Sequence, residues 1–183
     1  MSNGYHHGDL RRTLLEETAQ LIAEVGPGNV SLRELARRAG VSHAAPAHHF
    51  GDRRGLMTAL ATEGLRLLTD ELRAATPNGF DEAAVAYVRF AQAKPAHYAV
   101  MHRPELNDGE DRELAAARAN AAHELATGVA SIPVDRRSHV SDEEAAQAAW
   151  ALVHGLASLA EEGALPRADL EVIVRRVARQ LFA

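Results

Sequence analysis

The stretch Ser31–Phe50, SLRELARRAGVSHAAPAHHF, predicts two short helices joined by one tight turn. Ser31 is of a type that caps helix N-termini, and Gly40 is of the type that ends helices in the left-handed conformation. Ser42, two residues after that glycine, is expected to cap the second helix. The inward side of the first helix is expected at Leu32, Leu35, Ala36 and Ala39, which recur at helical spacing. The segment therefore has the pattern of a helix-turn-helix unit.

The polar residues of this unit favour one kind of partner. The predicted solvent side of the first helix carries Arg33, Glu34, Arg37 and Arg38, and three histidines follow the turn. A helix-turn-helix unit with exposed basic side chains can place its second helix in the major groove of DNA. We therefore expect binding to double-stranded DNA. The alternative is a buried three-helix lobe without a partner.

Composition narrows the class of protein. The chain has 183 residues, which is enough for one or two compact domains, and it has no cysteine. Disulfide frameworks and thiolate metal sites are thereby excluded. The sequence contains no run of 18 apolar residues, so no membrane span is expected, and the segment MSNGYHHGDLRR lacks the apolar core of a secretory signal. A cytoplasmic location follows as the expectation.

Charge is shared unevenly along the chain. The formal net charge is −5. Residues 1–55 contain seven Arg, six Asp or Glu and five His, so this segment is slightly positive and the remainder is acidic. An acidic body does not prevent DNA binding, because the surface that faces the phosphates decides the local field.

The hydropathy pattern predicts an all-α fold of about nine helices. Apolar residues make up 46% of the chain and aromatic residues only 4%, and Ala and Leu, two strong helix formers, dominate the apolar content. Besides the two helices of the opening motif, helices are expected at 9–25, from Asp52 to just before Pro77, and at 81–94, 95–102, 111–130, 141–162 and 166–182. We expect a three-helix helix-turn-helix domain at residues 1–52 and a helical ligand-sensing and dimerisation domain at 53–183.

The whole pattern resembles the TetR family of transcriptional regulators. The resemblance rests on the entry helix, the block SLRELARRAGVSHAAPAHHFGDRRGL and the all-helical acidic body. Trp150, His154 and Gly155, with the leading YHHGDLR, resemble the subgroup that carries a Trp-His-Gly signature in its C-terminal domain. The resemblance implies a homodimeric regulator, usually a repressor, that binds a palindromic operator and is released by a small-molecule effector.

Transfer of roles from the family suggests the DNA contacts. The second helix and the turn before it would present Ser42, His43, Ala44, Ala47, His48 and His49 to the bases and backbone. Ser31, Leu32 and Arg33 would touch phosphates, and Arg53 would make a further contact. Many relatives have Tyr at Ala47 and Leu at Pro46. Because Pro46 falls near the first helical turn, where a missing N–H costs least, the helix is expected to survive.

Histidine pairs do not predict a metal site. His6-His7 and His48-His49 are adjacent in sequence, and adjacent helical residues point about 100° apart, so they rarely share an ion. No metal and no other cofactor is expected.

The body offers a candidate effector pocket. Polar and aromatic side chains are expected to turn inward at Tyr87, Phe90, Tyr98, Met101, His102, His123, Trp150 and His154. Such a set can line an apolar cavity with a few polar anchors. For each of these residues taken alone, ordinary core packing is the better interpretation, and it is the group as a whole that favours a pocket.

The last two predicted helices are candidates for the dimer interface. Their aliphatic stripes comprise Leu152, Leu156 and Leu159 on one helix and Leu170, Val174, Val177 and Leu181 on the other. One face is expected to pack on its own body and another on a second subunit, as a four-helix interface. The alternative is that both stripes are wholly intramolecular.

We expect the effector to act through the long helix that begins at Arg53, by changing the spacing of the two reading helices. Two other classes of function compete with this one. A hydrolase using His97, His102 or His154 lacks any recognisable nucleophile elbow, zinc motif or phosphate loop, so no enzyme is expected. A helical protein-interaction module, or a small-molecule-binding protein that does not bind DNA, is the remaining alternative.

Overall fold

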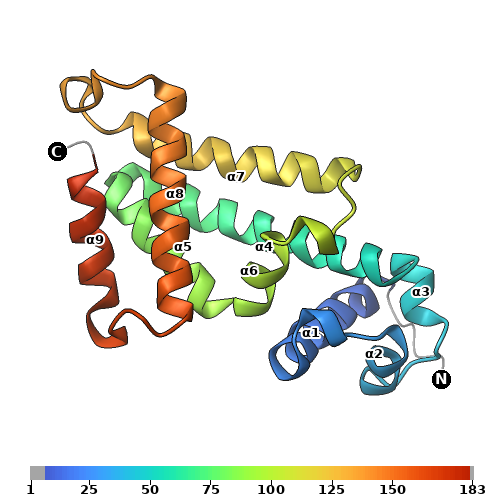
Figure 1. The fold of residues 1–183 in the computed structure, drawn as a ribbon. Coiled ribbons are helices and arrows are strands. Elements are labelled where there is room, and N and C mark those ends of the chain that lie inside the picture. The colour runs from blue at the N-terminus through green and yellow to red at the C-terminus, as the bar shows by residue number, and fades with distance from the viewer. Residues whose placement is uncertain (1–6, 182–183) are drawn as a thin grey trace. The chain divides into compact units, whose positions relative to one another are not determined.

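The structure, a computed structural model, describes residues 7–181, with side chains from Leu10 onward. The described residues form helices and connecting turns and contain no strand, as expected for an all-α fold (Figure 1). The α-helices are α1 (His7–Val25), α2 (Leu32–Arg38), α3 (Ala45–Phe50), α4 (Arg53–Ala75), α5 (Phe80–Ala93), α6 (Pro95–Met101), α7 (Arg112–Ala130), α8 (Asp142–Glu161) and α9 (Leu170–Gln180). Short 3-10 turns lie between them, including η1 (Pro27–Asn29) before α2 and η5 (Arg167–Asp169) before α9.

The chain forms two compact units. The N-terminal unit comprises the residues up to Gly64 together with Pro95–Ala115, and the C-terminal unit comprises Leu65–Lys94 and the residues from Ala116 onward. Helices α4 and α7 therefore each begin in the N-terminal unit and continue into the C-terminal unit. The expected functional boundary between residues 52 and 53 stays a prediction.

The N-terminal unit has a leucine-rich core. Leu14 and Leu15 of α1, Leu35 of α2, and Leu56 and Leu60 of α4 are almost completely buried. Burial of such a side chain stabilises the fold by about 1.5–3 kcal/mol. Thr18 is also buried in α1, and its hydroxyl donates to the Leu14 carbonyl at 2.6 Å, so burial leaves no polar group unsatisfied there.

Two glycines of α4 permit close approach by neighbouring helices. A Cβ on Gly55 would lie 2.0 Å from the carbonyl oxygen of Phe50, the last residue of α3. A Cβ on Gly64 would lie 2.9 Å from the Cβ of His97 on α6. The sequence therefore lets α3 and α6 pack against α4 more closely than any side chain would allow.

The loop between α6 and α7 is tied to α4 within the N-terminal unit. Asn107 is fully buried, and its Nδ2 donates to the carbonyls of Val100 and Arg103, each at 3.0 Å. Arg54 Nε donates to the Asn107 carbonyl at 2.9 Å, and the Asp108 amide donates to Thr58 Oγ1 at 2.8 Å. A loop without regular secondary structure is thus held by side-chain hydrogen bonds.

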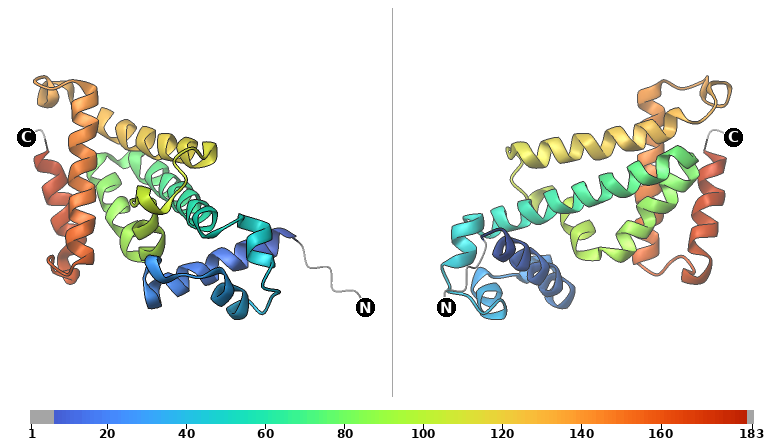
Figure 2. Two further views of the ribbon diagram at one scale, coloured as in Figure 1. Left: turned by 45° about the vertical axis from the view of Figure 1, so that its right-hand side comes forward. Right: turned by 180° about the vertical axis from the view of Figure 1, so that it is seen from behind.

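The C-terminal unit is organised around α5. Nine of the 14 residues of α5 are buried, and the helix packs against α8 and α9, which lie side by side in both views of Figure 2. Ion pairs join α5 to α9: Glu82 with Arg175, Asp81 with Arg179, and Arg89 with Glu171, at N–O distances of 2.6, 2.7 and 2.8 Å. The bidentate Arg175 guanidinium lowers the pKa of Glu82.

Several predicted helix ends are confirmed. Ser141 and Glu144 form the expected capping box at the start of α8, and Gly163 follows this helix with a φ of +74°. Asp52 Oδ1 accepts the Gly55 amide at 2.8 Å at the start of α4. The last helix begins at Leu170 rather than Pro166, because the chain first makes the 3-10 turn η5. Helix α1 begins at His7, before the expected cap Asp9, whose side chain lies outside the described residues.

Candidate nucleic-acid interface

The turn between α2 and α3 has the predicted geometry. Gly40 adopts a φ of +65°, and its amide donates to the Arg37 carbonyl at 3.3 Å. The Val41 amide donates to the Ala36 carbonyl at 3.0 Å, which completes a Schellman motif. At the other end of α2, Ser31 Oγ accepts the Glu34 amide at 3.2 Å. The expected cap and stop of this helix are therefore confirmed.

The start of α3 differs from the expectation. Its N-cap is Ala44, and no side chain caps it, so the prediction that Ser42 is the cap is wrong. The chain first makes a turn in which the Ser42 carbonyl accepts the Ala45 amide at 3.0 Å, and the helix begins only after it. Pro46 lies in the first turn and is buried, and the short helix is retained as expected.

Most of the proposed DNA-contacting residues lie at the surface. Ser31, Arg33, Ser42, His43, Ala44, Ala47 and His48 are exposed, whereas Leu32, His49 and Arg53 are half-buried. The rings of His48 and His49 lie 5.6 Å apart at 71°, so they meet edge to face. The helix-turn-helix unit therefore presents hydroxyl, guanidinium and imidazole groups to solvent, and their contacts with DNA stay predictions.

Arg53 is placed differently from the other predicted contacts. Its Nε donates to the Val30 carbonyl at 3.0 Å, and its Nη2 donates to the Pro27 carbonyl. Both acceptors lie in the segment that joins α1 to α2. The guanidinium of Arg53 is thus engaged with the protein backbone, which the sequence pattern did not indicate.

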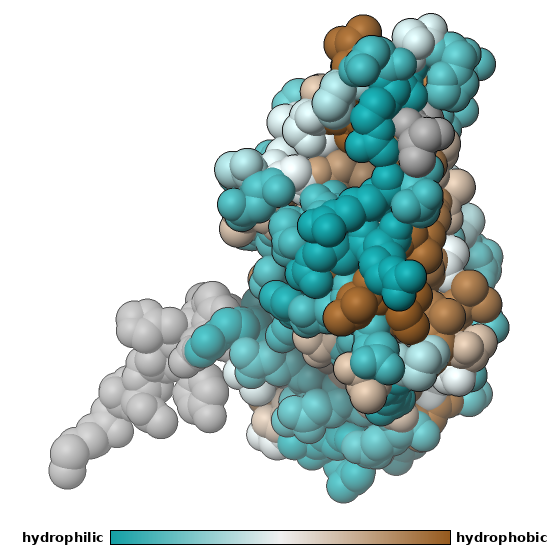
Figure 3. Space-filling model, turned by 90° about the vertical axis from the view of Figure 1, so that its left-hand side faces the viewer, coloured by the Kyte–Doolittle hydropathy of each residue, from teal (hydrophilic) through white to brown (hydrophobic). Residues whose placement is uncertain are grey.

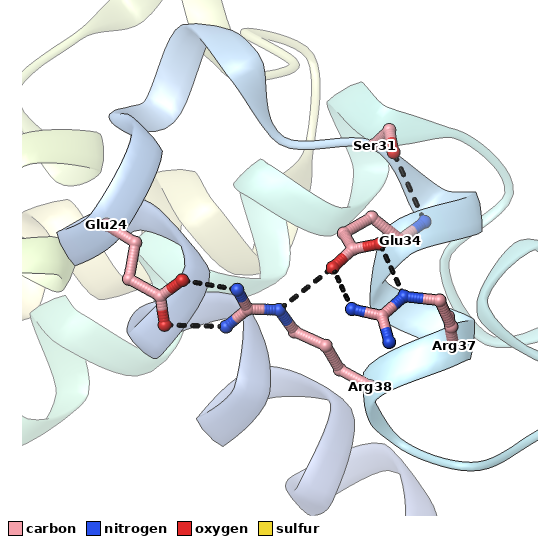
Figure 4. A network of polar contacts seen from close by, with 5 residues as sticks. All are labelled: Glu24, Ser31, Glu34, Arg37 and Arg38. Atoms are coloured by element: carbon pink, nitrogen blue, oxygen red, sulfur yellow. Dashed lines mark hydrogen bonds and ion pairs between the residues drawn. The ribbon is translucent and has the colours of Figure 1, made fainter.

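An ion-pair network joins α1 to α2 (Figure 4). Arg38 makes a bidentate contact with Glu24 of α1, with Nη1 2.7 Å from Oε1, and its Nε donates to Glu34 at 3.2 Å. Arg37 is bidentate to Glu34, at 2.8 and 2.7 Å. The Arg37 and Arg38 guanidiniums lower the pKa of Glu34 to about 2, and Arg38 lowers that of Glu24.

This network decides which arginines of α2 remain available to bind a phosphate. Arg37 and Arg38 were expected to stand on the solvent face of α2, but both are paired with carboxylates. The side chain of Arg33 is exposed and has no hydrogen-bond or ion-pair partner among the described residues. Arg33 is therefore the arginine of α2 that is most available to a phosphate.

Sequence reasoning missed a polar cleft in the N-terminal unit. The cleft has a volume of about 440 Å³, and Arg11, Phe50, Asp52, Arg54 and Thr58 are among its lining residues. The Arg11 guanidinium lies 5.4 Å from the centre of the Phe50 ring, a cation–π contact between α1 and the end of α3. The only available signal was the Arg11-Arg12 pair in the entry helix, which has no distinctive spacing.

The eight candidate effector residues are divided between the two units. Tyr98, Met101 and His102 belong to the N-terminal unit, and the other five belong to the C-terminal unit. Tyr87, Phe90, Tyr98 and Met101 are buried in the cores of their units, and His102 and His154 are half-buried. Their binding of an effector stays a prediction.

Two of these eight residues were wrongly expected to turn inward. His123 is exposed, and Trp150 is 51% exposed. Trp150 instead stacks on His154 along the surface of α8, with ring centres 5.7 Å apart and planes at 25°. The small residues Ala145, Ala149 and Ala157 take the buried side of α8, which turns the tryptophan outward. Partial burial lowers the pKa of His154.

The candidate dimer residues are also divided. Leu156, Leu170 and Val174 are buried within their own unit, whereas Leu152, Val177 and Leu181 are half-buried and Leu159 is 43% exposed. The inward stripe of an amphipathic helix covers its own core, and these three residues do so here. The role of the seven residues in a dimer stays a prediction. Figure 3 shows apolar surface beside hydrophilic residues on the side where α8 and α9 lie. Leu159, Trp150 and Val172 are exposed apolar residues of these two helices.

The described part of the chain offers neither a metal centre nor a membrane span. Residues 7–181 contain no group of three or more His, Asp or Glu side chains arranged to hold a metal ion. His6, one of the paired histidines, lies outside the described residues. No helix within the same range is long and apolar enough to cross a bilayer.

Comparison with known families assigns the class of protein. Residues 14–60 match the family of bacterial regulatory proteins called tetR, and residues 80–181 match the Tetracyclin repressor-like C-terminal domain. The second match alone covers more than half of the chain. The chain therefore belongs to the TetR family, as its helix-turn-helix block and helical body led us to expect.

The chain is also similar to individual proteins and solved structures. It is 32% identical to a Rhodococcus sp. RHA1 protein of unknown function, with a TM-score of 0.80 over 99% of this chain and 97% of that one. PfmR of Thermus thermophilus, a TetR family transcriptional regulator, shares the fold at a TM-score of 0.70 and 20% identity, over 92% of this chain and 96% of that one. The HTH-type transcriptional regulator BetI of Stenotrophomonas maltophilia is 31% identical over 111 residues, which cover 52% of this chain and 57% of that regulator.

Proposed function

We propose that this protein is a ligand-responsive transcriptional regulator that binds a palindromic operator as a homodimer, most simply as a repressor. The observation that carries the proposal is the α2–Gly40–α3 turn, with its Schellman closure and its exposed polar face, in a chain of the TetR family. In this arrangement α3 is the helix that enters the major groove.

The proposed contacts follow from exposure and chemistry. His43 and His48 lie exposed before and within α3, where an imidazole can donate to or accept from a base edge. Ser31 and Arg33, at the start of α2, offer a hydroxyl and a guanidinium to phosphates, and that guanidinium has no partner within residues 10–181. Ala47 supplies only a methyl group, which suits contact with a thymine methyl.

Homodimerisation is proposed because one short reading helix makes too few base contacts for operator-level affinity. Each mismatched base pair costs only about 1–3 kcal/mol, so a second half-site is needed for selectivity. The surface that we propose for the second subunit is the exposed apolar part of α8 and α9, at Trp150, Leu159 and Val172. A closed two-fold pairing would match the symmetry of a palindrome.

Effector control is proposed to run through α4. This helix starts directly after α3 and continues into the C-terminal unit, so its position links the reading helix to the body. An effector that binds the body in one α4 position better than in another would shift the equilibrium between reading-helix spacings. The residues that contact the effector are proposed to be among the polar and aromatic residues of the C-terminal unit, such as Tyr87 and His154.

Selection of bound duplexes from a random DNA pool tests the proposed function. Enrichment of an inverted repeat with half-sites about one or more helical turns apart is the expected result. Recovery of no sequence above background would contradict DNA reading and would favour a helical protein-interaction module. Recovery of single half-sites would support sequence-specific binding by α3 and would contradict binding as a homodimer.

A further inference from the structure

Arg53, the first residue of α4, directs its side chain at the protein's own backbone. Its Nε donates to the Val30 carbonyl at 3.0 Å, and its Nη2 donates to the Pro27 carbonyl. The two acceptors lie three residues apart in one short segment, and the planar guanidinium fork reaches both at once.

We propose that Arg53 is a positioning residue, which holds the start of α2 in the orientation that DNA reading requires, and that it is not itself a phosphate contact. This inference rests on the proposed DNA-binding function. It replaces the phosphate contact that the family resemblance implied for this position.

The two carbonyls matter because they lie in the short segment that leads into α2. Pro27 begins the turn η1, and Val30, the residue that follows this turn, is extended and only 3% exposed. The next residue is Ser31, the N-cap of α2. Fixing the Pro27 and Val30 carbonyls therefore fixes the origin of α2 and, with it, the Ser31 hydroxyl and the Arg33 guanidinium.

The opposite end of α2 is held in a comparable way. Arg38, its last residue, is bidentate to Glu24 on α1 (Figure 4). Helix α2 has only seven residues and is too short to be stable by itself, so tertiary contacts must define its direction. One arginine from α4 and one arginine to α1 add polar contacts at its two ends to the packing of the buried Leu35 and Ala36.

Lysine substitution separates positioning from phosphate binding. A lysine keeps the positive charge and binds phosphate as a point charge, but it cannot reproduce a planar fork to two carbonyls. Arg53→Lys should therefore preserve a phosphate contact and disturb a positioning contact. Arg33, which is exposed and without a partner among the described residues, provides the matched control in the same unit.

The experiment measures the affinity of a selected operator duplex as a function of salt for the full-length wild type, R53K, R53A, R33K and R33A. We expect R53K and R53A to weaken binding to a similar extent, by about tenfold. The slope of log affinity against log salt concentration should stay that of the wild type in both variants. R33A should instead make this slope shallower by about 0.9, and R33K should restore the wild-type slope. The inference would be overturned if R53K bound the operator with wild-type affinity and R53A had a slope shallower by about 0.9, because that pattern is the one of a lost phosphate contact.

A second measurement does not depend on DNA. Hydrogen exchange of the free protein should show faster exchange of the Glu34 and Leu35 amides, which bond to Ser31, in R53K than in the wild type or R33K. Unchanged exchange at these amides in R53K would contradict the positioning role, even if R53A fails to fold. Failure of the wild type to bind any duplex would refute the proposed function, and the exchange result would still decide whether Arg53 positions α2.

Discussion

The carbonyl oxygen of Phe50 lies 2.0 Å from the point that a Cβ on Gly55 would occupy. The end of the reading helix α3 therefore rests directly on the first turn of α4, with no side chain between them. Any movement of the first turn of α4 must be followed by the C-terminus of α3, because close-packed groups transmit displacement.

Gly55→Ala should destabilise the protein by about 3 kcal/mol, since the Phe50 carbonyl cannot yield without shifting the backbone. Gly109→Ala is the matched control in the same unit, because a Cβ there meets nothing within 4 Å and the residue has no positive φ. Its effect should stay within about 0.5 kcal/mol. Urea unfolding of both variants gives the comparison, and equal stability of the two would contradict the close approach.

Glu34 should contribute to stability in a pH-dependent way. Its folded-state pKa is lowered from 4.5 to about 2 by Arg37 and Arg38, so this contribution is fully present above about pH 4.5 and is lost as the pH falls towards 2. The difference in stability between the wild type and Glu34→Gln should shrink over that window. Denaturant titrations at several pH values test this, with the exposed Glu71→Gln as the control. A difference that stays constant down to about pH 2 would contradict the assignment.

Asn107→Ala should cost about 2–3 kcal/mol, because it removes two hydrogen bonds from a fully buried amide that anchors the loop between α6 and α7. Asn120→Ala, at an exposed position of α7, should be nearly neutral. Thermal unfolding of the two variants distinguishes them. A neutral Asn107→Ala would mean that the loop is held by the Arg54 and Thr58 bonds alone.

Trp150→Ala should shift the protein from dimer to monomer at micromolar concentration without unfolding it, because the side chain is 51% exposed on the proposed dimer surface. Val134→Ala, at a more exposed position in the turn after α7, is the control and should leave the assembly unchanged. Sedimentation velocity reports the assembly, and circular dichroism reports the fold. A dimer that tolerates Trp150→Ala would place the interface elsewhere.

The fold was largely predictable, because helix signals are local. Ser31, Gly40, Asp52 and the Ser141 capping box each fix a helix end through bonds within a few residues, and all four were found as predicted. The start of α3 was missed, since a turn through Ser42 delayed the helix and left Ala44 as an uncapped N-cap.

The functional residues were harder to predict, because their surroundings depend on contacts distant in sequence. Nothing near Arg53 indicates that its guanidinium bonds to Val30, 23 residues earlier. The helical pattern was expected to turn Trp150 inward, but Ala145, Ala149 and Val153 are among the residues that occupy the buried side of α8. Periodicity identified an amphipathic helix in this case without showing which side faces the core.

The central claim is that α3 reads a specific DNA sequence. The most direct test compares a selected operator duplex with a scrambled duplex of equal length, using fluorescence anisotropy, for the wild type and His48→Ala. We predict that the wild type prefers the operator by about 10³-fold or more and that His48→Ala loses more affinity for the operator than for the scrambled duplex. Equal affinity of the wild type for both duplexes would contradict the claim.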